Sequence, residues 1–205
     1  MVLNYILTRL EKGYRMKKTT FILAIFSFQI LLSDAIIGKR IKNSRMKMLN
    51  GTNAKLHDFK NNGPLIINFW TTWCMVCNKQ NEYLNQINDH FSNIGVNVLG
   101  VNINAPDIVN KVKPHVEKKN INYSVAIDPR SKIAKNFNVE AVPTLFFIDS
   151  DGTILNKIVG YSDGTENEIL DVLTNYLNDQ DIPYEKFEYN IINKKSNNIE
   201  IEADF

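Results

Sequence analysis

An apolar run that ends in two closely spaced cysteines constrains this chain more than any other feature. Residues 65–70 read Leu-Ile-Ile-Asn-Phe-Trp, which is typical of a buried strand, and Trp-Cys-Met-Val-Cys follows at residues 73–77. Apolar residues then recur at helical spacing as far as Phe91, and a glycine ends the pattern soon after. The sequence therefore predicts a strand followed by a helix, with Cys74 at the mouth of the helix and Cys77 one turn in.

The position of the two cysteines favours exchange between a dithiol and a disulfide. At the start of a helix, the free amide N–H groups and the positive end of the helix dipole stabilise a thiolate, so we expect a lowered pKa for Cys74. Cys77 lies deeper and is expected to keep its proton longer. These positions predict Cys74 as the thiol that attacks, and Cys77 as the resolving thiol that closes the intramolecular disulfide.

Two other uses of the cysteine pair fit the sequence less well. A structural zinc site needs four ligands, and the three histidines, His57, His90 and His115, are scattered without paired spacing. A purely structural disulfide between Cys74 and Cys77 would close a very small loop and stabilise the fold only modestly. We therefore expect no metal and no cofactor, and a redox-active disulfide between the two cysteines.

The N-terminal segment is similar to a secretory signal. Met16 and two lysines lead into an apolar stretch over residues 21–32, and Ser-Asp-Ala follows at residues 33–35, with small residues suited to cleavage after Ala35. We expect residues 1–35 to be an N-terminal extension plus this signal, with Met16 as an alternative start, and the protein to be periplasmic or otherwise exported. An uncleaved membrane anchor is the alternative, although the apolar stretch is shorter than the ~20 residues that span a bilayer.

The balance of charge argues against nucleic acid as a partner. The 205 residues include 24 Lys and Arg against 22 Asp and Glu, which gives a net charge of +2 without a basic patch. We expect proteins as partners, and a monomer.

Strands and helices alternate along residues 36–178, which we expect to form one domain. The pattern predicts a hairpin over residues 47–59, strands over 65–70, 97–102, 123–127, 142–148 and 153–159, and helices over 106–119, 131–137 and 164–177 beside the one after Cys74. This order predicts an α/β fold in which helices flank both sides of a mixed central sheet. Residues 179–205 are expected to be a C-terminal tail that frays or forms a hairpin.

A Val-Pro-Thr sequence at residues 142–144 completes a resemblance to a known fold. Together with the strand, the cysteine motif and the helix, it is similar to the thioredoxin fold, in which the corresponding proline is cis and lies beside the redox pair. The Asn-Phe-Trp-x-x-Trp-Cys-x-x-Cys run at residues 68–77, the hairpin before it and the inserted segment 106–127 resemble the TlpA/ResA-like branch of exported thiol-disulfide oxidoreductases, over residues 46–177. The fold implied is thioredoxin-like with an N-terminal β-hairpin.

The resemblance implies roles for residues around the cysteines. Trp73 would shape the rim of the site, and the backbone at Val142 and Pro143 would hold the cysteine-bearing segment of a partner protein by strand-like pairing. The enzyme would exchange disulfides with protein substrates, such as apocytochrome c, and a membrane thiol donor would keep it reduced. Met75 and Val76 offer no hydrogen bond to a thiolate, which disfavours a strongly oxidising pair and favours a reductase.

Of three supporting residues, Gln80, Asn68 and Glu82, the first two depart from the family pattern. Gln80 stands where that branch often has a glutamate, three residues after the second cysteine, and Asn68 takes the place of the buried aspartate of thioredoxin. An amide cannot accept the proton of Cys77 as a carboxylate does, so water or the nearby Glu82 would have to substitute. We expect slower or more pH-dependent resolution by Cys77 than in a relative that has the acid.

Two alternative functions stay open at this point. Peroxiredoxins share the fold and place a threonine where Thr71 stands, three residues before the reactive cysteine, but their pattern has a proline in place of Ile67. A carrier of copper or haem would use both sulfurs as soft ligands, and no cluster of Met or His supports it.

Overall fold

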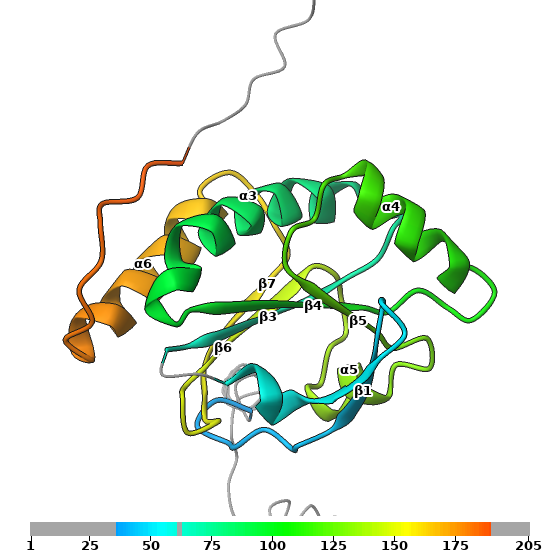
Figure 1. Cartoon of the computed structure of the whole chain (residues 1–205), viewed down its shortest axis with the longest axis horizontal. Helices are drawn as coiled ribbons and strands as arrows, with labels where there is room; N and C mark the ends of the chain where they lie inside the picture. The colour runs from blue at the N-terminus through cyan, green and yellow to red at the C-terminus, as the bar shows by residue number, and fades with distance from the viewer. Residues whose placement is uncertain (1–35, 61–62, 190–205) are drawn as a thin grey trace, which may run out of the picture. The chain divides into compact units, whose positions relative to one another are not determined.

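The strand that precedes the cysteines lies near the middle of a mixed sheet. The computed structural model describes residues 36–60 and 63–189, and in these residues seven strands run in the order β2-β1-β5-β4-β3-β6-β7 (Figure 1). The strands are β1 (Arg45–Met48), β2 (Asn53–Lys55), β3 (Leu65–Trp70), β4 (Asn97–Asn102), β5 (Ser124–Ile127), β6 (Thr144–Ile148) and β7 (Ile154–Val159). The α-helices are α3 (Met75–Phe91), α4 (Val112–Lys118), α5 (Lys132–Asn136) and α6 (Thr165–Asp179), with 3-10 turns η1 (Leu56–Phe59), η2 (Ser92–Ile94) and η3 (Val109–Lys111).

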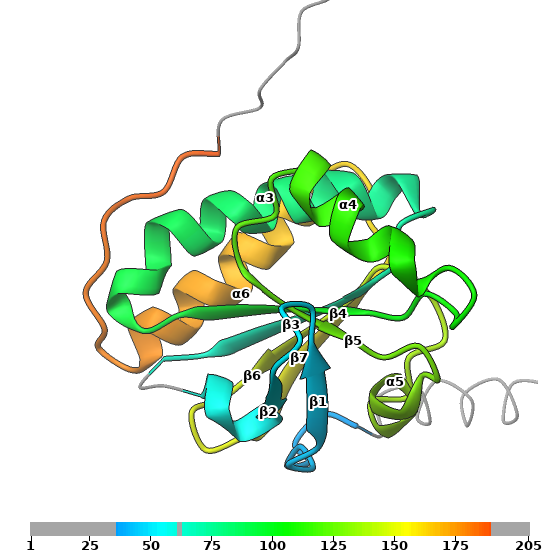
Figure 2. The same cartoon turned by 45° about the vertical axis from the view of Figure 1, so that its right-hand side comes forward.

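The burial of β3 explains its place in the sheet. All of its residues are buried, so both of its faces need cover. It pairs in parallel with β4 and antiparallel with β6, and β5 continues the parallel group. Right-handed crossovers that step in one direction along a sheet put their helices on the same face. Figures 1 and 2 show α3, α4 and α6 over one face and α5 on the other, which confirms the predicted mixed sheet with helices on both sides.

The predicted N-terminal hairpin is also confirmed. β1 and β2 pair antiparallel, with Met46 opposite Ala54. Gly51 lies in the turn with a φ of 91°, a left-handed conformation that glycine adopts without strain. β1 pairs in addition with β5, so the hairpin extends the sheet at the edge away from β6.

Successive residues of β3 meet different surroundings on the two faces of the sheet. On the face that α3 and α6 cover, Ile66 and Trp70 belong to the main core cluster. On the opposite face, the ring centroid of Phe69 lies 5.3 Å from that of Phe137 and 5.9 Å from that of Phe146. Asn68 is on the face that α3 and α6 cover, where it introduces a fully buried amide between apolar neighbours.

The helix predicted over residues 106–119 is wrong in its first half. Residues 106–108 form a turn, η3 follows, and α4 begins only at Val112. Pro114 explains the late start, because proline has no N–H to donate and its ring clashes with the carbonyl four residues earlier. It is tolerated in the first turn of a helix, which is where α4 has it. The strand predicted from residue 142 also begins later, at Thr144.

The chain after α6 has no regular secondary structure as far as residue 189, but it packs against α3. The ring centroid of Phe187 lies 5.5 Å from that of Phe91, and the centroid of Tyr189 lies 4.7 Å from that of Tyr83. The remainder of the predicted tail hairpin, residues 190–205, and the predicted signal in residues 1–35 lie outside the described residues. In the parts of the chain that are described, no helix combines the length and apolar character of a membrane span.

Candidate redox site

Side-chain hydrogen bonds hold the loop between β3 and α3. Asn104, just after β4, accepts a hydrogen bond from the Thr72 N–H at 2.9 Å through its Oδ1, and its Nδ2 donates to the Thr72 hydroxyl oxygen at 2.7 Å. Asn102 accepts from the Asn104 N–H at 3.0 Å. The end of β4 therefore fixes the loop that presents Cys74.

Cys74 is the N-cap residue of α3, and its side chain folds back over the first turn of the helix. Its Sγ accepts a hydrogen bond from the Cys77 N–H at 3.2 Å. The two sulfurs form a disulfide with an S–S distance of 2.04 Å. Cys74 is 6% exposed and Cys77 is fully buried, so Cys74 is the outer sulfur, as predicted. Cys74 is nevertheless largely buried, because an N-cap side chain lies over the first free N–H groups of its helix.

A second segment, distant in sequence, meets the disulfide at Cys74. The Cys74 Sγ lies 3.9 Å from the carbonyl oxygen of Val142, and the Val142–Pro143 peptide bond is cis, as the resemblance implies. Beside the sulfurs, Trp73 is 69% exposed and Met75 is 80% exposed. The structure thus places the predicted Val142–Pro143 backbone beside Cys74, and the exposed side chains of Trp73 and Met75 adjoin Cys74 along the chain.

Behind the disulfide, four buried polar side chains form a hydrogen-bonded chain. The Gln80 Nε2–H donates to the Asn68 Oδ1 at 2.8 Å, and the Asn68 Nδ2–H donates to the Asn81 Oδ1 at 2.8 Å. The Tyr123 hydroxyl donates to the same Asn81 oxygen at 2.9 Å. The two predicted supporting amides, Gln80 and Asn68, are therefore in direct contact.

The third supporting residue, Glu82, does not belong to this group. Its side chain is exposed, and the structure does not bring it to the buried amides. Within the hydrogen-bonded chain, Tyr123 is the one group that titrates, and burial raises its pKa, so it stays protonated. The buried network behind Cys77 is polar and uncharged near neutral pH.

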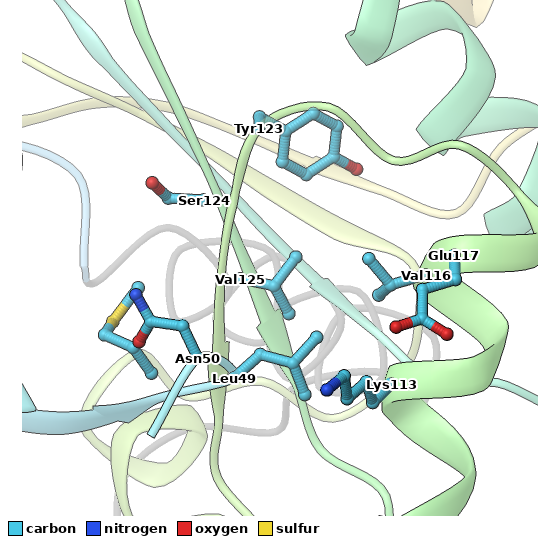
Figure 3. A pocket seen from close by; sticks show the side chains of 9 residues that line it. Leu49, Asn50, Lys113, Val116, Glu117, Tyr123, Ser124 and Val125 are labelled. Carbon is cyan, nitrogen blue, oxygen red and sulfur yellow. The ribbon is translucent and has the colours of Figure 1, made fainter. Parts of the chain in front are cut away.

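Sequence reasoning missed Asn81 and Tyr123. Asn81 follows Cys77 by four residues in α3, so helical spacing alone could have placed it on the same face. Tyr123 carries no such signal, because only the tertiary contact brings it to Asn81. Its ring also closes one end of a pocket of about 480 Å³ between the β1–β2 turn, α4 and β5, beside Leu49 and Val125 (Figure 3).

Helix α4 places a histidine next to the site. The ring centroid of His115 lies 5.5 Å from that of Trp70, and its Nε2 lies 2.9 Å from the Asn78 Oδ1. Burial, followed by the charges of Lys119 and Lys118, lowers the pKa of His115. Among the residues that the structure describes, no three His, Cys, Asp or Glu side chains gather as metal ligands would.

Comparison with known proteins connects this geometry to a family. Residues 37–157, more than half of the chain, match the AhpC/TSA family. The chain is a member of the AhpC/TSA family.

Relatives of this AhpC/TSA member include thiol-disulfide oxidoreductases. Thiol-disulfide oxidoreductase ResA of Bacillus thuringiensis subsp. konkukian (strain 97-27) is 36% identical over 124 residues, which cover 60% of this chain and 70% of that protein. ResA of Bacillus subtilis (strain 168) is 28% identical over 137 residues, which cover 67% of this chain and 73% of that protein. A crystal structure of a putative thiol:disulfide interchange protein DsbE from Chlorobium tepidum superposes with a TM-score of 0.64 at 23% identity, over 69% of this chain and 97% of that one.

These comparisons confirm the predicted thioredoxin-like fold and the TlpA/ResA-like resemblance. This AhpC/TSA-family chain is therefore a thiol-disulfide oxidoreductase. Its site supplies what such exchange requires: an outer sulfur at a helix N-terminus, an inner sulfur one turn away and an open apolar rim.

Proposed function

We propose that this protein is an exported enzyme that reduces disulfides in other proteins, with Cys74 as the attacking thiol and Cys77 as the resolving thiol. The observation that carries the proposal is the position of Cys74. Its Sγ accepts a hydrogen bond from the Cys77 N–H at 3.2 Å and lies 3.9 Å from the Val142 carbonyl oxygen. The sulfur is thus stabilised as an anion by a helix N-terminus and lies beside a backbone edge where a protein segment can pair.

The reaction follows from this geometry in two displacements. The Cys74 thiolate attacks one sulfur of the client disulfide, a bond forms between them, and the other client sulfur leaves as a thiolate. Cys77 then loses its proton and attacks the Cys74 Sγ, which releases the second client sulfur. The client gains two electrons, and Cys74 and Cys77 become the disulfide that the structure contains.

The Val142 main chain is suited to hold the client during these steps. In the described part of the chain, Val142 has no backbone hydrogen bond to another residue, because β6 begins two residues later. An extended client segment can pair with it as an added strand, while Trp73 and Met75 contact the client's apolar side chains. This places the client cysteine within reach of Cys74.

The reducing direction rests on the two residues between the cysteines. Met75 and Val76 carry no polar group for a thiolate, so the reduced form gains little stability beyond that from the helix itself. The reduction potential should lie nearer to about −270 mV than to the about −120 mV of strongly oxidising periplasmic dithiols. Residues 1–35 would direct export of the protein, which acts as a monomer. After each round of exchange, a membrane thiol donor would reduce the Cys74–Cys77 disulfide again.

Trapping of clients tests the assignment of the two thiols. A Cys77→Ala variant of the full chain should accumulate mixed disulfides through Cys74 in its host, because the resolving step is blocked. Non-reducing gels and mass spectrometry would identify the clients. The control is the variant with both Cys74→Ala and Cys77→Ala, which should trap nothing; equal adducts in both variants, or none in either, would contradict the proposal.

Direction and reaction class need separate measurements. Equilibration with glutathione buffers gives the reduction potential of the Cys74–Cys77 pair, and a value close to about −120 mV would overturn the reductase assignment.

One observation favours the peroxidase alternative: the Thr71 hydroxyl is buried and has no hydrogen-bond partner among the described residues. Consumption of hydrogen peroxide that depends on Cys74, without reduction of insulin disulfides, would replace the present proposal with that one.

A further inference from the structure

Three buried polar atoms on α3 and β3 lack a hydrogen-bond partner among the described residues, and Trp70, which carries one of them, belongs to the same core cluster as Cys77. They are the Oε1 of Gln80, the Nδ2 of Asn81 and the Nε1 of Trp70. Gln80 and Asn81 follow Cys77 by three and four residues in α3, so the side chains of Cys77, Gln80 and Asn81 project from one face of the helix. Buried polar atoms in folded proteins are nearly always paired, with protein or with an internal water molecule.

The environment of Gly100 places the Trp70 nitrogen on the same side of β4 as the ring of Tyr123. A Cβ atom at Gly100 would lie 3.0 Å from the Trp70 Nε1 and 3.0 Å from the ring edge of Tyr123. The Tyr123 hydroxyl in turn donates to Asn81 at 2.9 Å. The glycine therefore leaves room on β4 for the side chains of Trp70 from β3 and of Tyr123 from the segment before β5.

We propose that Gln80, Asn81 and Trp70 hold a water molecule behind the redox pair, and that this water donates a hydrogen bond to Cys77 as its thiolate forms. The donor and acceptor count fits one water. Its two lone pairs accept from the Asn81 Nδ2–H and the Trp70 Nε1–H, one of its hydrogens goes to the Gln80 Oε1, and the other is left for the Cys77 Sγ.

The consequence is that the resolving thiol is stabilised as an anion rather than deprotonated by a fixed acid. Two N–H donors polarise the water and strengthen the hydrogen bond that it donates to the sulfur. This deepens the proposed function, on which it rests for its role in catalysis, and it makes Gln80, Asn81 and Trp70 positioning residues. The water itself and the pKa of Cys77 can be measured without any client.

The titratable groups packed around this place are few. Tyr83 lies on α3 and Cys74 is the N-cap of this helix, Tyr123 precedes β5, and the ring of His115 of α4 lies next to that of Trp70, tilted by 39°. From α6, the main-chain oxygen of Glu166 accepts from the Tyr83 hydroxyl. Burial, followed by the charges of Lys119 and Lys118, lowers the pKa of His115, and comparing variants over the same pH range holds the state of this histidine constant.

The two tryptophans of the chain provide a matched test. In a Cys74→Ala background, Cys77 is the single cysteine, and its pKa follows from the pH dependence of alkylation or from its ¹³Cβ chemical shift. Trp70→Phe keeps the buried ring and removes the Nε1 donor, and should raise the pKa of Cys77 by about one unit, a tenfold lower thiolate fraction at neutral pH. Trp73→Phe makes the same change at an exposed position and should leave the pKa of Cys77 unchanged.

A second variant and a direct observation complete the test. Gln80→Met keeps the length of the side chain without its oxygen, and should raise the pKa of Cys77 in the same direction as Trp70→Phe. A high-resolution crystal structure of the oxidised protein should show one water within hydrogen-bond distance of all three atoms. An unshifted pKa in both variants, or a crystal structure without that water, would overturn this inference and leave the roles of Cys74 and Cys77 as client-trapping defines them.

Discussion

The two faces of the sheet differ in what they bury, although β3 contributes to both. On the face toward α5, the rings of Phe69, Phe137 and Phe146 pack against one another, and the Lys157 Nζ lies 5.9 Å from the centroid of the Phe146 ring. On the face toward α3, Asn68 interrupts the apolar row and joins Gln80 in a buried amide network. One face is therefore optimised for packing, whereas the other gives up part of its apolar burial to keep polar atoms behind the disulfide.

The largest expected loss of stability comes from removing an aromatic ring on the face toward α5. Phe146→Ala should lower the free energy of unfolding by about 3–5 kcal/mol, because it leaves a cavity between the rings of Phe69 and Phe137. Urea unfolding measures the loss, and Phe146→Leu, which fills most of the space, should lose much less. The folded fraction of Phe146→Ala should still exchange disulfides at the parental rate; a matching loss of activity per folded molecule would break the distinction between the two faces.

A charge placed on the polar face should reveal how dry that face is. In Asn68→Asp, burial would raise the pKa of the new carboxyl above its ordinary value near 4, because the charged form is disfavoured. The folded state then binds a proton that the unfolded state releases, so stability falls as the pH rises above about 4 and stays low above the raised pKa. A shift of two units corresponds to about 2–3 kcal/mol at pH 7.

The exposed Asn93 provides the control for that experiment. Asn93→Asp introduces the same charge at the surface and should change the free energy of unfolding little between pH 4 and pH 7. If the stability of Asn68→Asp is equally insensitive to pH, water reaches the face toward α3 more readily than the complete burial of Asn68 indicates.

Overpacking of the polar face at Gly100 should have a smaller effect. In Gly100→Ala the new methyl group would lie 3.0 Å from both the Trp70 Nε1 and the Tyr123 ring, and one of them has to move. We expect a loss of about 1–2 kcal/mol in the free energy of unfolding, together with a shift in tryptophan fluorescence. An alanine variant as stable as the parent would mean that these two rings are not closely packed over β4.

The smallest expected effect is a pH dependence from His115, at the outer edge of the same face. Burial, followed by Lys119 and Lys118, lowers the pKa of this histidine in the folded state. The unfolded chain therefore takes up a proton first as the pH falls below about 6.5, and the folded state loses stability in that range. In His115→Gln, the urea concentration at the unfolding midpoint should change less between pH 7 and pH 5 than in the parent. A midpoint that falls just as steeply in the variant would assign the effect to other groups.

Local sequence patterns accounted for most of the elements. The predicted boundaries of β3 and β4 coincide with those in the structure, because short, mostly apolar segments between turn residues leave little choice. The helix over residues 106–119 failed in its first half because Pro114 restricts the start of a helix more than the periodicity of its neighbours favours one. The inner and outer order of Cys74 and Cys77 also followed from sequence, since a helix begins between them.

By itself, the sequence determined the class of fold, the redox pair and the helix that carries it, because each depends on neighbours along the chain. Only the tertiary structure decided which side chains surround that pair. The Val142 carbonyl reaches Cys74 from before β6, and Tyr123 reaches Asn81 from before β5, and both contacts depend on how the strands are ordered in the sheet. The polar surroundings of the redox pair are therefore set in part by residues that no local pattern connects, since long-range packing brings Asn68 and Tyr123 to Asn81 in α3.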